Sequence, residues 1–105
     1  VRAEDTDWRQ VLALYDQMYV LTRSPVVALN RAVALAEVDG PDAALAAIEG
    51  LALRGYQPFH AVRADLLARA GHPAVAEYER AIELCTDPGE RDFLQKRKDH
   101  LHFRS

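Results

Sequence analysis

The residues of this chain that could carry metal or nucleophilic chemistry are few and widely spaced. His60 and His72 lie in separate segments, and His100 and His102 would point to different faces of a helix. With Cys85 as the one cysteine, there is no His-x3-His or Cys-x2-Cys spacing for a metal. No glycine-rich phosphate loop is present. We therefore predict no metal, no cofactor, no small-molecule substrate and no enzymatic activity.

The composition indicates a small helical protein with a slightly acidic charge balance. The chain has 105 residues, half of them hydrophobic, and alanine and leucine dominate. The net charge of -3 argues against the broad basic surface of a DNA- or RNA-binding domain. A single cysteine fits a reducing cytoplasm, and no apolar run approaches the ~18–20 residues of a membrane span. Val1–Asp5 is not a signal peptide, and without an initiator methionine we expect a fragment of a longer protein.

Prolines, glycines and capping residues divide the chain into six predicted helices. Serine or aspartate before proline marks several starts, because proline at the first helical position needs no N–H partner. The connections are short, so neighbouring helices are expected to pack antiparallel. The predicted helices cover residues 7–22, 25–38, 41–51, 58–70, 75–84 and 88–103, and the last of these could be capped by Thr86 or Asp87.

A helical motif occurs twice along the chain. Arg31-Ala32 recurs as Arg63-Ala64, and Pro41 recurs as Pro73, both after about 32 residues, close to the ~34-residue period of helix-turn-helix repeats. Ala32, Ala44 and Ala64 fall where the tetratricopeptide consensus has small residues at helix crossings. The consensus also has positions that hold larger residues, and Leu35, Leu67 and Tyr78 fall at or beside those positions. The chain thus resembles tetratricopeptide repeats, although a plain six-helix bundle is the alternative.

This resemblance implies an all-α, tetratricopeptide-like right-handed solenoid of about six antiparallel helices. We predict a single domain over residues 1–105, made of a half repeat (7–22), two repeats (24–53 and 57–86) and a capping helix (88–103). The basic residues of the last helix, which include Lys96 and Arg97, suit a helix C-terminus through the macrodipole. Nucleic-acid contact by this helix has no further support in a chain of net negative charge.

A longer stretch is more specific than the generic repeat. Four segments of the chain resemble the C-terminal extension of a group of bacterial extracytoplasmic-function-type RNA polymerase sigma factors. These segments are Asp7–Asp16, Ser24–Ala34 (SPVVALNRAVA), Asp39–Pro41 and His60–Leu67. Two departures are Arg23, where that family often has proline, and a shorter turn at Gly71. The resemblance implies a tetratricopeptide-like domain that follows the promoter-binding domains and contributes to sigma activity or its control.

Polar residues on the first helix of each repeat form a predicted partner-binding groove. In such arrays these helices line the concave face, where apolar residues such as Leu29 would form the floor, a surface suited to a peptide or a helix. The alternative is that the polar side chains are simply solvated, and that His60 is a packing residue. The predicted groove consists of Asn30, Arg31, Glu37, His60, Arg63, Asp65 and Arg69.

Arg31 and Arg63 stand where the repeat consensus prefers an apolar residue facing the paired helix. An unpaired buried charge is costly, so each arginine needs a partner. Asp65, Glu37 and Asp39 are candidates. Either the arginines form a polar seam that docks a partner segment, or they form structural bridges that fix helix register.

The expected function is protein–protein or intramolecular docking that regulates an alternative sigma factor in transcription initiation. The expected partners are the upstream sigma domains of the same chain, core RNA polymerase, or both. Promoter DNA would be contacted only through N-terminal domains absent from this sequence, and no membrane is involved. A generic tetratricopeptide adaptor for an unrelated peptide is the alternative, and a helical fragment of an enzyme is a third possibility, disfavoured because no catalytic set is visible.

Overall fold

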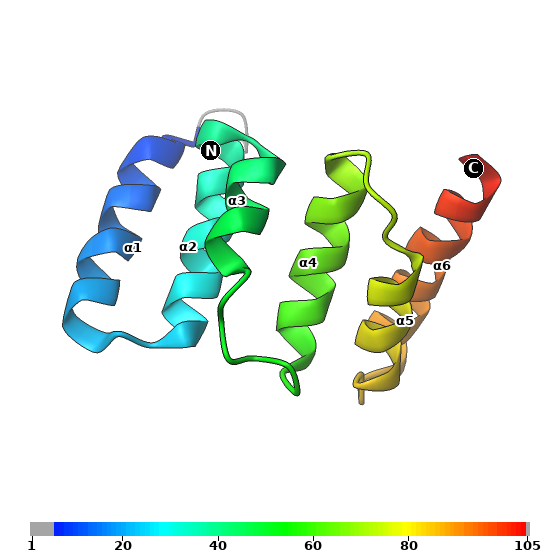
Figure 1. The fold of residues 1–105 in the computed structure, drawn as a ribbon. Helices are drawn as coiled ribbons and strands as arrows, with labels where there is room; N and C mark the ends of the chain where they lie inside the picture. Colours follow the sequence, from blue (N-terminus) through cyan, green and yellow to red (C-terminus); the bar gives the residue numbers. More distant parts are fainter. Residues whose placement is uncertain (1–5, 105) are drawn as a thin grey trace. The chain divides into compact units, whose positions relative to one another are not determined.

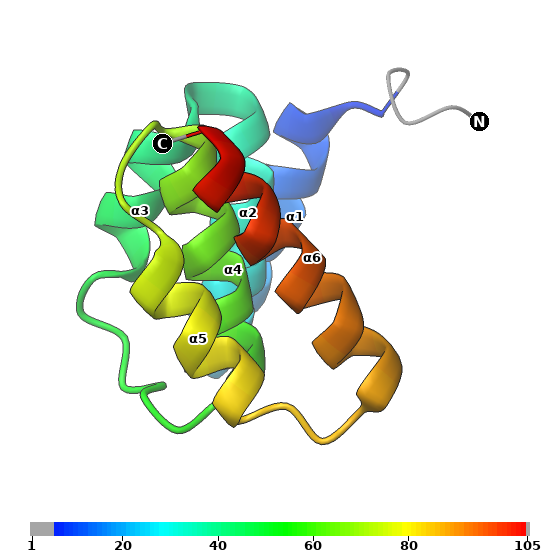
Figure 2. The same ribbon diagram turned by 90° about the vertical axis from the view of Figure 1, so that its right-hand side faces the viewer.

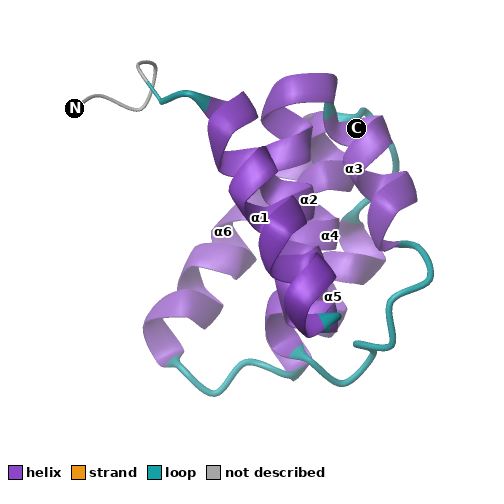
Figure 3. Ribbon diagram, turned by 90° about the vertical axis from the view of Figure 1, so that its left-hand side faces the viewer, coloured by secondary structure: helices purple, strands orange, loops and turns teal. Residues whose placement is uncertain are grey.

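The computed structural model of the chain describes residues 6–104, with side chains through Leu101. Within that range every regular element is an α-helix, and no strand is present (Figure 3). The prediction of an all-α fold with six helices is therefore confirmed. The helices are α1 (Trp8–Thr22), α2 (Pro25–Asp39), α3 (Pro41–Ile48), α4 (Gln57–Arg69), α5 (Val75–Glu83) and α6 (Pro88–Arg104).

The chain divides into two compact units, Val1–Ala52 and Leu53–Ser105, which we call unit 1 and unit 2. In unit 1, α2 packs against both α1 and α3, and in unit 2, α5 packs against both α4 and α6 (Figure 1). Within each unit the helices thus pack in sequence order. The grouping of these helices into tetratricopeptide-like repeats remains a prediction.

Side-chain caps fix the helix starts that the sequence predicts. The Asp7 carboxylate accepts a hydrogen bond from the Gln10 backbone N–H at 3.3 Å, and the Ser24 hydroxyl accepts one from Val27 at 3.4 Å. At α6 the cap is Asp87, which accepts from the Glu90 N–H at 3.1 Å. Each cap satisfies a backbone donor that has no partner inside the helix.

Two predicted boundaries are wrong by a few residues. The third helix ends at Ile48, so Leu51 lies outside it. Gly50 intervenes, and glycine is a poor helix former because it loses the most backbone freedom on folding. The fourth helix begins at Gln57, so Pro58 occupies its second position, where the proline N–H is still not needed.

Small residues lie at the most tightly packed positions of both units. Ala32 and Ala44 in unit 1, and Ala64 and Ala81 in unit 2, are all 0% exposed. A side chain of one methyl group lets two helix backbones approach closely, and a larger residue here would force the helices apart. The burial of Ala32, Ala44 and Ala64 agrees with their predicted place at helix crossings.

Arg23 ends α1 in the left-handed conformation, with φ at 52°. Its backbone N–H donates to the Tyr19 carbonyl at 2.8 Å, and its guanidinium lies 5.4 Å from the centroid of the Tyr19 ring. Proline fixes φ near -65° and has no N–H, so it could neither adopt this conformation nor make this bond. The structure thus accounts locally for the departure from proline at this position.

The turn after α4 depends on Gly71, whose φ is +80°. A Cβ at this position would meet nothing within 4 Å, so the cost of Gly71→Ala comes from the backbone alone. We expect a loss of about 1–2 kcal/mol in the free energy of unfolding, measured by thermal and urea denaturation. Gly50→Ala is the matched control, because Gly50 is equally open and lies outside the left-handed region. Equal effects of the two substitutions would contradict the prediction.

Candidate functional site

A pocket of about 430 Å³ lies within unit 2 and is lined by the last turn of α4, by Tyr78 of α5 and by residues 93–101 of α6. The three helices can be followed in Figure 2, where α6 lies beside α5. Five of its side chains come from one face of α6, because residues three, four, seven or eight apart lie on the same side of a helix. We call it the α6 pocket; it is lined by Ala68, Arg69, Tyr78, Phe93, Lys96, Arg97, His100 and Leu101.

The core of unit 2 supports the apolar part of the α6 pocket. Tyr78 is only 2% exposed, and it packs with small residues and Leu94 of the core. Ala68 and Leu101 are partly buried against the same cluster. Phe93, by contrast, is 56% exposed and offers an accessible aromatic face. The pocket therefore combines a rigid apolar base with one exposed ring.

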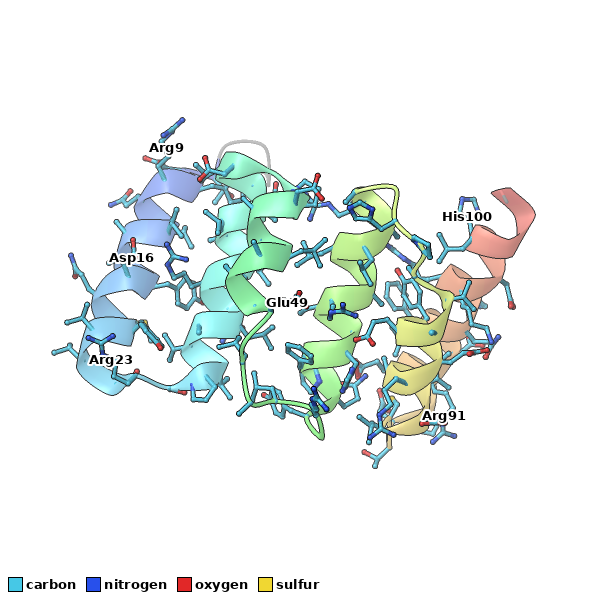
Figure 4. All side chains as sticks on the ribbon, viewed as in Figure 1. Arg9, Asp16, Arg23, Glu49, Arg91 and His100 are labelled. Atoms are coloured by element: carbon cyan, nitrogen blue, oxygen red, sulfur yellow. The ribbon has the colours of Figure 1, made fainter. Side chains whose placement is uncertain are left out.

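The charged groups that line the α6 pocket are cationic. Arg69, Lys96 and Arg97 contribute positive charges, His100 adds an imidazole ring, and none of the lining residues is acidic. Figure 4 shows His100 in the C-terminal half of α6. A cluster of cations beside an apolar base favours anionic groups that also carry an apolar side chain.

Arg97 is held in place by contacts on several sides. It donates a hydrogen bond to the Asp65 carboxylate at 2.8 Å, and its guanidinium carbon lies 5.6 Å from the centroid of the Phe93 ring. A hydrogen bond with the Tyr78 side chain raises the pKa of Arg97 above its usual value, burial opposes this, and the Asp65 charge adds to the increase. The guanidinium therefore stays charged and is already oriented before any ligand binds.

Asp65 links two of the pocket's cations, since its second carboxylate oxygen lies 3.8 Å from Arg69. Lys96 pairs with Asp92 at 3.0 Å, but both of these side chains are largely exposed, so the pair is weak. Lys96 can therefore exchange Asp92 for an acidic group of a ligand at little cost. The α6 pocket thus contains two cations that share Asp65, namely Arg69 and Arg97, and one exchangeable cation, Lys96.

A second polar network lies between α4 and α5. His60 is 7% exposed, and its Nδ1 lies 2.9 Å from a Glu77 carboxylate oxygen while its Nε2 lies 2.5 Å from the Arg54 carbonyl oxygen. Each ring nitrogen of His60 therefore has an oxygen neighbour within hydrogen-bond distance. Arg63 lies 3.4 Å from the other Glu77 oxygen. His60 thus presents no free polar atom to a partner, and Arg63 has a structural bridge.

In unit 1, Arg31 also has an acidic neighbour, because its Nε donates to the Asp16 carboxylate of α1. The sequence suggested Asp65, Glu37 and Asp39 as partners of the two arginines, whereas the structure pairs them with Asp16 and Glu77. Both partners come from the neighbouring helix of the same unit. These contacts favour the structural bridge over the docking seam for Arg31 and Arg63.

The structure brings some of the predicted groove residues together and leaves others apart. Asp65 lies 3.8 Å from Arg69, and Arg69 lines the α6 pocket. Asn30 and Glu37 are exposed on α2 in unit 1. Leu29, predicted on the groove floor, is 2% exposed and belongs to the buried residues of unit 1, so that prediction is wrong. Leu29 lies on the same face of α2 as the buried Ala32 and Ala36, three and seven residues further on.

The sequence did not single out four other α6-pocket residues, namely Tyr78, Phe93, Lys96 and Arg97, as part of a site. The helical spacing of Phe93, Lys96, Arg97 and His100 was available as a signal for a shared face. The pairing of Asp65 with Arg97 had no sequence signal, since it depends on the packing of α6 against the rest of unit 2.

Cys85 is 4% exposed, and its Sγ lies 3.3 Å from the Asp87 carbonyl oxygen. In the part of the chain that the structure describes, no three His, Cys, Asp or Glu side chains gather closely enough to hold a metal ion. Over the same residues, no helix is both long and apolar enough to cross a membrane.

Comparison with known proteins gives one informative similarity. An uncharacterized protein of Rhizobium meliloti (strain 1021) is 42% identical over 104 residues, which covers 95% of this chain and 25% of that relative. No family model matches the chain, and no solved structure matches it. The chain therefore spans about a quarter of the relative's length. That relative has about 300 residues outside the match, enough for roughly two further domains.

Proposed function

We propose that this chain is the C-terminal docking domain of an extracytoplasmic-function-type sigma factor, and that it regulates transcription initiation by binding a segment of the same sigma factor or of core RNA polymerase. The observation that carries the docking role is the α6 pocket, where cations surround an apolar base. The sigma assignment is supported by the resemblance of Ser24–Ala34 and its flanking segments. The length of the rhizobial relative leaves room for upstream domains.

The chemistry of the α6 pocket favours an acidic segment with an apolar or aromatic side chain as its ligand. Arg97 can offer guanidinium N–H groups beyond the one used by Asp65, and a guanidinium matches a carboxylate in a planar, two-bond geometry. Phe93 provides apolar area that is still exposed. A pocket of about 430 Å³ accommodates a few side chains, which is the scale of a short peptide motif and not of a whole domain face.

Docking at this pocket would be controlled by the covalent link to the rest of the protein. A weak contact between parts of one chain is favoured by a high effective concentration, which depends on the linker. Core polymerase would then either compete with this segment for the cations of the α6 pocket or bind the domain together with it. The domain would in this way bias the sigma factor between two states without any catalytic step.

Site-specific photo-crosslinking from the pocket wall tests this function. A benzophenone amino acid replaces Phe93 in the full-length protein, which is then irradiated with and without purified core polymerase. We expect crosslinks to an acidic stretch upstream in the same chain or to a polymerase subunit. The control carries the same residue at Ala47, which is exposed on α3. No crosslink beyond that of the control would contradict the proposal and favour an adaptor for an unrelated peptide.

A further inference from the structure

A second pocket, of about 530 Å³, lies beside the α6 pocket and also within unit 2. It is lined by residues 71–75, which connect α4 to α5, together with Ala68 of α4 and Leu101 of α6. We call it the turn pocket, and the connection that forms it can be followed in Figure 2. Ala68 and Leu101 line the α6 pocket as well, so the two pockets adjoin at these side chains. A ligand held in the α6 pocket therefore has the turn pocket within reach.

The side chains of the turn pocket are mostly apolar. Pro73, Ala74 and Val75 line it, and none of its lining residues is an arginine, lysine, aspartate or glutamate. Ala74 is 3% exposed and belongs to the core cluster of unit 2, against which Ala68 and Leu101 pack. The base of the turn pocket is thus part of the same core that supports the α6 pocket.

The backbone donors of the turn are already used by α4. The Gly71 N–H donates to the Ala68 carbonyl at 3.2 Å, and the His72 N–H donates to the Leu67 carbonyl at 2.9 Å. Pro73, the next residue, has no N–H. Residues 71–73 therefore hold no spare backbone donor for a carboxylate, and the lining suits an apolar side chain better than an anionic one.

We propose that the turn pocket is a second anchor point for the acidic segment that docks in the α6 pocket, and that it receives an apolar side chain of that segment. This inference rests on the proposed function, since it takes the α6 pocket as the docking site, but it does not depend on the sigma assignment. The charge distribution assigns the two groups, because cations line the α6 pocket and the turn pocket has no permanent charge.

An apolar anchor is needed because the cations of the α6 pocket are well hydrated. The side chains of Arg69, Lys96 and Arg97 are 38%, 76% and 45% exposed. Ion pairs with exposed groups contribute little, whereas an apolar side chain gains from every part of its surface that leaves water. The charges therefore orient the segment, and the turn pocket adds affinity.

The adjoining pockets also restrict the spacing of the two ligand residues. Side chains three or four residues apart in a helix, or two apart in an extended segment, lie on one face at roughly 5–7 Å. We therefore expect the apolar residue about two to four positions from the acidic one.

Photo-crosslinking from the turn pocket tests this inference in the full-length protein. The benzophenone amino acid replaces His72, which is exposed, and the captured sites are mapped by mass spectrometry beside those captured from position 93, with and without purified core polymerase. We expect both positions to capture the same segment, at sites within about four residues of each other. The variant labelled at Ala47 again gives the background.

The outcomes separate this inference from the proposed function. If position 93 captures an acidic stretch while position 72 captures a different segment, a second copy of the protein, or nothing above background, the inference is overturned and the proposed function stands. If position 93 captures nothing above background, the proposed function fails and the inference fails with it.

A neutral substitution gives an independent reading of the apolar anchor. Val75→Gln should lower the crosslink yield from position 93 about fivefold, because an amide replaces an apolar contact without any change in net charge. Ala76→Gln is the matched control, since Ala76 is exposed on the same turn of α5 and does not line either pocket. Circular dichroism checks that both variants keep their helices, and equal yields from the two would overturn the inference.

Discussion

Reversal of two charges in the α6 pocket, Arg69→Glu with Lys96→Glu, is expected to lower crosslinking from position 93 at least tenfold. The double variant replaces two attractive contacts with an acidic ligand by two repulsive ones, and a tenfold change corresponds to only about 1.4 kcal/mol. Both residues are exposed, so the fold should be retained. The crosslink yield of the full-length protein is the measurement, with circular dichroism as the check on helix content.

The matched control is a double variant that changes the net charge by the same amount as Arg69→Glu with Lys96→Glu, but elsewhere on the surface. Arg9→Glu with Arg54→Glu alters two exposed arginines outside the α6 pocket and should leave the yield unchanged. Added salt should lower the yield of the unmodified pocket, because exposed charges are screened over about 10 Å at 0.1 M ionic strength. An equal loss in both double variants would show that overall charge, and not the pocket, governs the contact.

Truncation of the pocket's base is expected to have the largest effect on stability. Tyr78→Ala should lower the free energy of unfolding of unit 2 by about 3–5 kcal/mol, since it leaves a cavity in a fully packed core. That is a large share of the stability of a small domain. Urea denaturation followed by circular dichroism measures the loss.

Tyr78→Phe separates packing from the hydrogen bond. The ring is kept, while the hydroxyl that interacts with Arg97 is lost, so we expect a loss of only about 1 kcal/mol. The same variant should weaken the crosslink from position 93, because Arg97 is less firmly oriented. If Tyr78→Phe and Tyr78→Ala destabilise the protein equally, the ring does not support the core as described.

The helices were predictable because local chemistry determines where they begin. Asp7, Ser24 and Asp87 cap helices within a few residues of themselves, and Pro25 and Pro88 reinforce the signal at the second and third of these starts. The burial of Ala32 and Ala64 also followed from the repeated motif. The end of α3 was less predictable, because Gly50 is not itself a definite stop signal.

The candidate site was only partly predictable, because its residues depend on packing between helices. Asp65 and Arg69 share a helix face and could be grouped from the sequence, whereas Arg97 reaches Asp65 from α6. The basic residues of that helix were instead explained by the macrodipole, which needs no pocket. In the same way, Arg63 needed an acidic partner, but only the packing of α5 on α4 identifies Glu77.

Promoter-specific transcription is the measurement that tests the sigma assignment most directly. Purified core polymerase is combined with the full-length protein, either intact or lacking residues 1–105 of this segment. Our account predicts that the intact protein initiates at its promoter and that removal of the segment changes the yield of transcript at least tenfold. A decrease would mean that docking supports initiation, and an increase would mean that it restrains it. Equal yields, or no initiation by the intact protein, would contradict the account.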